Sequence, residues 1–167
     1  MNKLTSFFVI AIFAMLYSFS ARADMPVGKN ALLVNFGVTG GGPALGLDFE
    51  HGYDSTFGVG GYFRMDPDDK DNGVPGLTAI GGFIRPHFNR QQWDFYVSPG
   101  FGFIFWKQGN RSTQSLLGPT LALGLLYEFS TAVSVGIETM QYASWTGSGT
   151  DRGLKQTDLM AKFRFIF

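Results

Sequence analysis

The sequence contains no cysteine and carries no excess of either charge. Small exported domains are often held together by disulfides, so a chain without cysteine needs another source of stability. The 13 basic and 13 acidic residues give a formal net charge of zero, and they form neither a basic patch nor an acidic tail. This composition excludes a disulfide scaffold and gives no indication of nucleic-acid binding.

Long hydrophobic runs are also lacking after residue 24, because glycine interrupts each of them. The long run at residues 4–19 follows Lys3 and precedes Ala21-Arg-Ala23, a small-residue cleavage site. This order is typical of a secretory signal peptide, and the run is short for a membrane-spanning helix, which needs about 20 apolar residues. We predict that residues 1–23 are a cleaved signal peptide and that residues 24–167 form one domain.

Glycine and phenylalanine are abundant, with 23 and 18 residues. A transmembrane β-barrel uses both, because phenylalanine suits the lipid-facing side and glycine leaves room in a narrow lumen. Apolar and polar residues alternate with a period of two, which indicates strands. In the last segment one face carries Leu159, Ala161, Phe163, Phe165 and Phe167, and the other carries Asp158, Met160, Lys162, Arg164 and Ile166.

Seven further segments show the same alternation, less clearly in the fourth, where Ile80 and Ile84 lie opposite Ala79 and Phe83. Their lengths suit tilted spanning strands of about 9–11 residues. The fold class is therefore an all-β, antiparallel up-and-down transmembrane barrel of eight strands, with both termini periplasmic and longer polar loops facing outward. We place the seven segments at 29–39, 43–52, 55–66, 76–88, 92–106, 115–129 and 132–144.

Charged residues occupy the face opposite the apolar one, so we expect them in the lumen. A charge there must be paired or solvated, and an eight-stranded barrel is just wide enough for side chains to fill it. Two interpretations follow: a plug of ion pairs, which we favour because both signs are available, or a narrow water-filled channel, which the lumen glycines would allow. The predicted lumen charges are Asp48, Glu50, Arg64, Asp94, Glu128, Glu138, Asp158, Lys162 and Arg164.

Two stretches resemble a known family. Gly118-Pro-Thr-Leu-Ala-Leu-Gly-Leu-Leu-Tyr-Glu-Phe129 and Ala132-Val-Ser-Val-Gly-Ile-Glu138 resemble the closing hairpins of small OmpA/OmpX-type outer-membrane barrels, and Lys162-Phe-Arg-Phe-Ile-Phe167 resembles their C-terminal assembly signal. The resemblance implies a porin-like, monomeric protein of the Gram-negative outer membrane, in contact with lipid and lipopolysaccharide. It also implies recognition by periplasmic chaperones and the barrel-insertion machinery through Phe163, Phe165 and Phe167.

Catalytic and metal sites are poorly supported. His51 and His87 fall at the periplasmic ends of their strands, where we expect polar rim residues rather than a proton-transfer site. The acidic stretch at 66–73 lacks the ligand spacing of a calcium loop, and Gly58-Val-Gly-Gly61 is no phosphate loop. We therefore predict a non-enzymatic barrel without metal or cofactor, with any binding through its outward loops. A lipid A modifying enzyme, as some barrels of this layout are, is the remaining alternative.

Overall fold

The computed structural model describes residues 27–167, except 41, 109–110 and 148–152. The predicted signal peptide and its cleavage site lie outside these residues. None of the described residues forms a helix long and apolar enough to cross a membrane. The strands are β1 (Asn30–Thr39), β2 (Gly42–Gly52), β3 (Phe57–Asp66), β4 (Gly76–Arg90), β5 (Trp93–Lys107), β6 (Gln114–Glu128), β7 (Val133–Ser144), β8 (Thr146–Gly147) and β9 (Gly153–Ile166).

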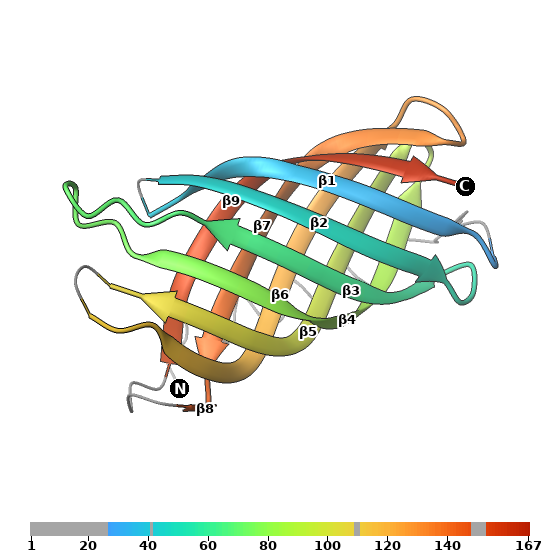
Figure 1. The fold of residues 1–167 in the computed structure, drawn as a ribbon. Coiled ribbons are helices and arrows are strands. Elements are labelled where there is room, and N and C mark those ends of the chain that lie inside the picture. The colour runs from blue at the N-terminus through green and yellow to red at the C-terminus, as the bar shows by residue number, and fades with distance from the viewer. Residues whose placement is uncertain (1–26, 41, 109–110, 148–152) are drawn as a thin grey trace, which may run out of the picture.

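Eight long strands close into one antiparallel barrel, as predicted (Figure 1). Each of them pairs with its neighbours along the chain, and the two-residue β8 adds only a short pairing with β6. The barrel closes where β1 pairs with β9, from Ala31 opposite Ile166 to Thr39 opposite Asp158. Because this seam is continuous, no long strand leaves an open edge of unpaired backbone groups.

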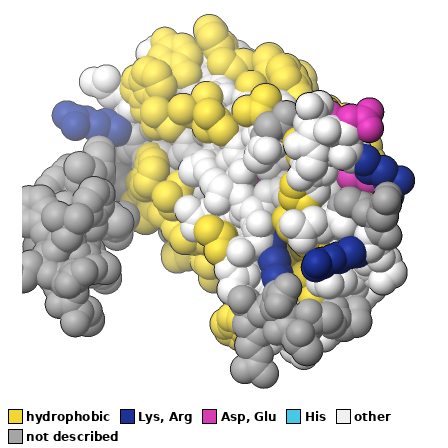
Figure 2. Space-filling model, turned by 90° about the vertical axis from the view of Figure 1, so that its left-hand side faces the viewer, with side chains coloured by type: hydrophobic (Ala, Val, Ile, Leu, Met, Phe, Trp, Pro, Cys, Tyr) yellow, Lys and Arg dark blue, Asp and Glu magenta, His cyan; other side chains and the backbone are white. Residues whose placement is uncertain are grey.

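Alternate residues of every long strand point inward and outward, with the outward set largely apolar. Seen from the left of Figure 1, hydrophobic side chains gather along the top of the molecule and in a patch on its left flank (Figure 2). A soluble protein would not expose so many large apolar side chains in one band, whereas hydrocarbon solvates them well. Exposed members include Phe36, Leu47, Phe49, Phe63, Ile80, Phe101, Phe103, Leu121, Ile137 and Phe165.

The apolar–polar alternation of the fourth strand is ambiguous because one large aromatic residue faces inward. Phe83 is buried in the lumen, while Ile80 and Ile84 are exposed on the outside. The ladder between β4 and β5 is also interrupted beside Pro86 and Pro99. Proline has no N–H to donate, so both residues weaken the pairing locally without ending either strand.

The barrel has two unlike ends. The turn end carries the start of β1, the finish of β9 and three short connections, at 53–56, 91–92 and 129–132. Asp54 stabilises the first of these, because its carboxylate accepts hydrogen bonds from the backbone N–H groups of Thr56 (2.7 Å) and Phe57 (2.8 Å). The hydrogen bonds from Thr56 lower the pKa of Asp54. The loop end carries the remaining connections, including 67–75 between β3 and β4.

Candidate functional site

The centre of the lumen is a set of buried ion pairs that joins strands from opposite sides of the barrel. Arg64 on β3 donates to Asp48 on β2 and, through Nη2, to Glu138 Oε1 on β7 at 2.9 Å. Lys162 on β9 donates from Nζ to Asp48 Oδ2 at 2.6 Å and to Glu138 Oε2 at 2.5 Å. All four side chains are almost completely buried. These contacts reach across the lumen and pair its opposite charges.

Arg85 on β4 extends this set toward the turn end. Its guanidinium donates to Glu50 Oε2 at 2.6 Å and to Asp48 Oδ2 at 3.0 Å. The guanidinium carbon lies 4.2 Å from the centre of the Phe83 ring and 4.5 Å from that of Tyr96. Cation–π contact with both rings explains why an aromatic residue faces inward at Phe83.

His87 continues the set, and the prediction that it is a polar rim residue is wrong. It is 2% exposed, with Nδ1 2.9 Å from Asp94 and Nε2 2.7 Å from Glu50 Oε1. The prediction failed because β4 runs on to Arg90, which places His87 inside the strand and not at its end. His51 is exposed, and its Nδ1 lies 2.8 Å from Asn30 Oδ1.

Arg164 completes the set at the turn end. It donates from Nη1 to Asp94 and from Nη2 to Glu128 Oε1 at 2.7 Å, and its Nε lies 3.2 Å from Ser134 Oγ. We call the whole set the ion-pair network: Asp48, Glu50, Arg64, Arg85, His87, Asp94, Glu128, Glu138, Lys162 and Arg164.

The ion-pair network balances its charges if His87 is a cation. It contains five carboxylates, three arginines and one lysine. Both ring nitrogens of His87 face carboxylate oxygens, which only accept hydrogen bonds when ionised. An imidazolium donates from both nitrogens, so the doubly protonated ring satisfies this geometry and supplies the fifth positive charge.

The nine predicted lumen charges all point inward, but they do not form one group. Eight of them lie in the ion-pair network, and Glu128 is partly exposed at its rim. Asp158 lies apart from these eight toward the loop end, where it accepts from Tyr142 Oη at 2.7 Å and from Met140 N at 3.0 Å. The interpretation from sequence missed Arg85, although it shares a strand face with His87. The alternation of the fifth and seventh segments does place Tyr96, Ser98 and Ser134 on the polar faces, and the structure buries them in the lumen. The interpretation also missed Asn35, Tyr142 and Gln156.

Large side chains from adjacent strands occupy the space beside several lumen glycines. A Cβ atom added at Gly124 would lie 2.0 Å from the Tyr96 ring, and one at Gly58 would lie 1.8 Å from Glu50 Oε1. A Cβ at Gly46 would meet the Arg64 side chain at 2.7 Å. Each glycine thus makes room for a bulky neighbour.

One small cavity lies among the described residues of the lumen. A cavity of about 10 Å³ lies beside Tyr62, Arg64 and Thr120. Tyr62 Oη, Arg64 Nε and Thr120 Oγ1 are buried without a hydrogen-bond partner. This volume is about that of one water molecule, and these atoms supply the two to four polar contacts that a buried water needs.

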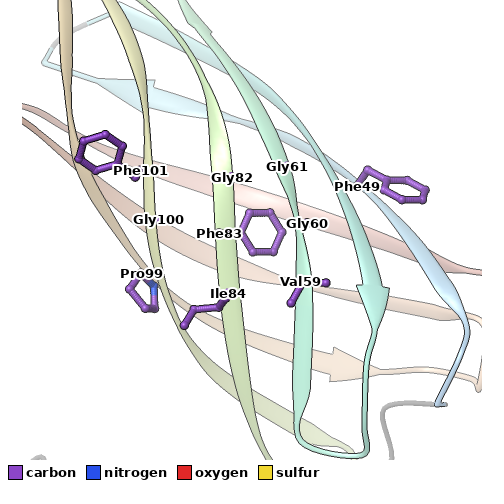
Figure 3. Close-up of a pocket in the computed structure, with 10 residues that line it drawn as sticks. All are labelled: Phe49, Val59, Gly60, Gly61, Gly82, Phe83, Ile84, Pro99, Gly100 and Phe101. Atoms are coloured by element: carbon purple, nitrogen blue, oxygen red, sulfur yellow. The ribbon is translucent and has the colours of Figure 1, made fainter.

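A shallow groove of about 740 Å³ runs across the outside of β3, β4 and β5 (Figure 3). It exists because Gly61 and Gly82, paired on adjacent strands, place no side chain there. The groove contains no titratable side chain, so it offers no acid, base or nucleophile for catalysis. Its lining consists of Phe49, Val59, Gly60, Gly61, Gly82, Phe83, Ile84, Pro99, Gly100 and Phe101.

The acidic loop between β3 and β4 is held by its own hydrogen bonds. Asp69 Oδ1 accepts from the backbone N–H groups of Asp71 (3.1 Å) and Asn72 (3.2 Å), and the bonds from Asn72 lower the pKa of Asp69. Asp68 pairs with Lys107 at 3.0 Å on the surface. The described residues contain no group of three or more His, Cys, Asp or Glu side chains placed to hold a metal ion.

The C-terminal segment closes the barrel. Phe167 N donates to Asn30 O at 2.8 Å, and Asn30 N donates to Phe167 O at 2.9 Å. On the outer face the rings of Phe36 and Phe163 stack across the seam with centroids 5.4 Å apart. Phe165 and Phe167 are exposed on the outside of the same strand end.

Comparison with solved structures identifies this fold as that of small outer-membrane barrels. The N-terminal β-barrel domain of Pseudomonas aeruginosa OprF matches with a TM-score of 0.67 at 13% identity, covering 84% of this chain and 98% of that domain. Neisserial surface protein A matches with a TM-score of 0.64 at 13% identity, covering 83% and 95%. The outer membrane enzyme PagL matches with a TM-score of 0.50 at 14% identity, covering 81% and 98%.

No family model matches the chain, and no curated protein matches it by sequence. The identities to solved structures are too low to carry activities across, so function must be argued from the lumen and the surface.

Proposed function

We propose that this protein is a closed, non-conducting barrel of the Gram-negative outer membrane with a structural or surface-interaction role. The observation that carries this proposal is the ion-pair network, in which arginine and lysine side chains reach across the lumen to buried carboxylates. An open pore keeps its charged side chains solvated, whereas these are dehydrated and bonded to one another.

The exterior supports the outer-membrane location. Large apolar side chains cover the strands, and the fold is shared with the barrel domain of OprF and with Neisserial surface protein A over nearly the whole of each solved chain. In this proposal the protein is a monomer in contact with lipid and lipopolysaccharide. Both termini are periplasmic, and chaperones and the insertion machinery recognise the C-terminal strand during assembly. Any specific binding uses the loop end.

Two measurements test the proposal against its alternatives. Liposomes that contain the purified protein should show no faster swelling in small sugars than empty liposomes, because no continuous path crosses the lumen. Swelling that depends on the protein would contradict the closed lumen and favour the narrow channel.

The enzyme alternative is tested on lipid A. PagL shares the fold and is an outer membrane enzyme, but the outer groove of the present protein has no titratable group. We expect identical lipid A mass spectra from cells with and without the protein. A protein-dependent change in acyl chains would contradict the non-enzymatic role.

A further inference from the structure

Two buried carboxyl groups toward the loop end lie outside the ion-pair network. Asp66 at the finish of β3 is 2% exposed, and Asp158 on β9 is 1% exposed. They are close enough to interact electrostatically. In the part of the chain that the structure describes, neither forms an ion pair with a lysine, arginine or histidine. The charges of the ion-pair network balance without Asp66 and Asp158. These two carboxyl groups are therefore left without a compensating charge where little water can reach them.

Nearby positive charge is already engaged. Arg64 acts electrostatically on both carboxyl groups, but its guanidinium is bonded to Asp48 and Glu138. Both oxygens of Asp158 already have a donor, because they accept from Tyr142 Oη and Met140 N. Asp66 is therefore the carboxyl group that most needs a compensating positive charge.

The hydrogen bonds of Asp66 show where that charge would lie. Its Oδ2 accepts from Gln156 Nε2 at 2.7 Å. Asp66 Oδ1 and Gln156 Oε1 are both buried acceptors without a donor, and Gln156 is 7% exposed. Buried polar atoms are nearly always satisfied in native proteins. Two unsatisfied acceptors on two hydrogen-bonded side chains indicate a donor or a positive charge that the described residues do not supply.

We infer that Asp66 and Gln156 form a binding site for one cation, which is held by Asp66 Oδ1 and Gln156 Oε1 and neutralises Asp66. Both binding atoms are oxygens, with no nitrogen or sulfur between them. Oxygen ligands suit a proton or a hard ion such as Ca²⁺ or Mg²⁺. A bound proton would make Asp66 a donor. A metal ion would need water to complete its shell, since the described residues place no third acidic side chain beside these two.

The groups that face Asp66 favour its neutralisation. Asp158 on β9 is a second buried carboxyl group, and Tyr142 on β7 donates its hydroxyl hydrogen to it. Among the described residues, Arg64 on β3 is the basic side chain that acts electrostatically on Asp66. A neutral Asp66 removes the repulsion between the two carboxyl groups. The folded protein is therefore more stable when the cation is bound to Asp66, and it loses this stabilisation when the cation leaves.

The test is the urea midpoint for unfolding of the full-length mature protein in detergent, compared with that of Asp66→Asn. Asparagine keeps the shape and needs no cation. If a proton is the ligand, the wild-type midpoint should fall relative to Asp66→Asn as the pH rises from mildly acidic to mildly alkaline. If a metal ion is the ligand, CaCl₂ or MgCl₂ should raise the wild-type midpoint at constant pH and ionic strength, and should not raise that of Asp66→Asn.

The matched control is Asp71→Asn, which removes an exposed carboxyl group from the adjacent loop and should keep the wild-type response. A difference between wild type and Asp66→Asn that changes neither with pH nor with divalent ions would overturn the inference. Should Asp66→Asn fail to fold, Gln156→Met serves instead, because it removes one of the two binding oxygens and should weaken the response to pH or to the ion. An unchanged response in Gln156→Met would equally overturn the site.

Discussion

Each charged side chain in the ion-pair network finds its partners on other strands. Glu138 on β7 accepts from Arg64 on β3, Lys162 on β9 and Tyr96 on β5. A carboxylate with three donors cannot be removed without leaving buried cations behind. At the residue scale, therefore, stability depends on complete sets of partners rather than on single pairs.

Glu138→Ala should destabilise the protein by roughly 3–5 kcal/mol, the usual cost of leaving a buried charge unpaired. The measurement is the urea midpoint in detergent micelles. Asp68→Ala is the control, because it breaks a solvent-exposed pair with Lys107 and should leave the midpoint nearly unchanged. Equal midpoints for both variants would show that the lumen charges are hydrated.

Lumen glycines should be intolerant of even one methyl group. Gly124→Ala would force a Cβ into the Tyr96 ring and should cost about 1–3 kcal/mol through overpacking. Gly82→Ala is the matched control from a neighbouring sheet region, because its Cβ would point outward and meet nothing nearer than 3.5 Å. We expect a lower urea midpoint for Gly124→Ala alone. A wild-type midpoint for that variant would mean that the lumen has spare room.

At the scale of the strand, the first and last elements depend on each other. The β1–β9 seam is made from the two ends of the described chain, and Phe167 contributes its final pair of backbone hydrogen bonds with Asn30. A barrel without this closure would expose two edges in hydrocarbon, where no water can satisfy them.

Deletion of Phe167 should therefore lower the yield of folded, heat-modifiable protein in the outer membrane. Phe167→Ala should lower it too if the aromatic ring is part of the assembly signal, since that variant keeps the backbone bonds. Gel mobility of heated and unheated membrane samples measures the folded fraction. Unchanged folded yield in both variants would remove the assembly role assigned to this residue.

Strand positions could be predicted from sequence because alternation is a local property. The last strand, with its phenylalanines opposite Lys162 and Arg164, is unmistakable in the sequence. The fourth strand is harder to predict, because the inward-facing Phe83 hides the alternation that would place Arg85 in the lumen. That ring faces inward to stack on the Arg85 guanidinium, which is a contact between two residues of one strand that only the lumen geometry explains.

At the scale of the whole molecule, the sequence predicted a charged lumen but could not predict the pairing. Which arginine meets which carboxylate depends on barrel register and shear. The position of His87 shows the same limit, since two more strand residues turn the expected rim residue into a buried side chain between Asp94 and Glu50. The role of the lumen glycines could not be predicted for a similar reason, because the side chains that fill the space beside them come from neighbouring strands.

The central claim is that the ion-pair network closes the lumen, and single-channel recording in planar bilayers tests it most directly. Wild-type protein, inserted and shown to be folded by heat modifiability, should give no steady conductance steps above the bare bilayer at any moderate voltage. Glu138→Ala should also remain closed, because neighbouring side chains still fill the lumen. Reproducible conductance steps from folded wild-type protein would contradict the account and make the barrel a channel.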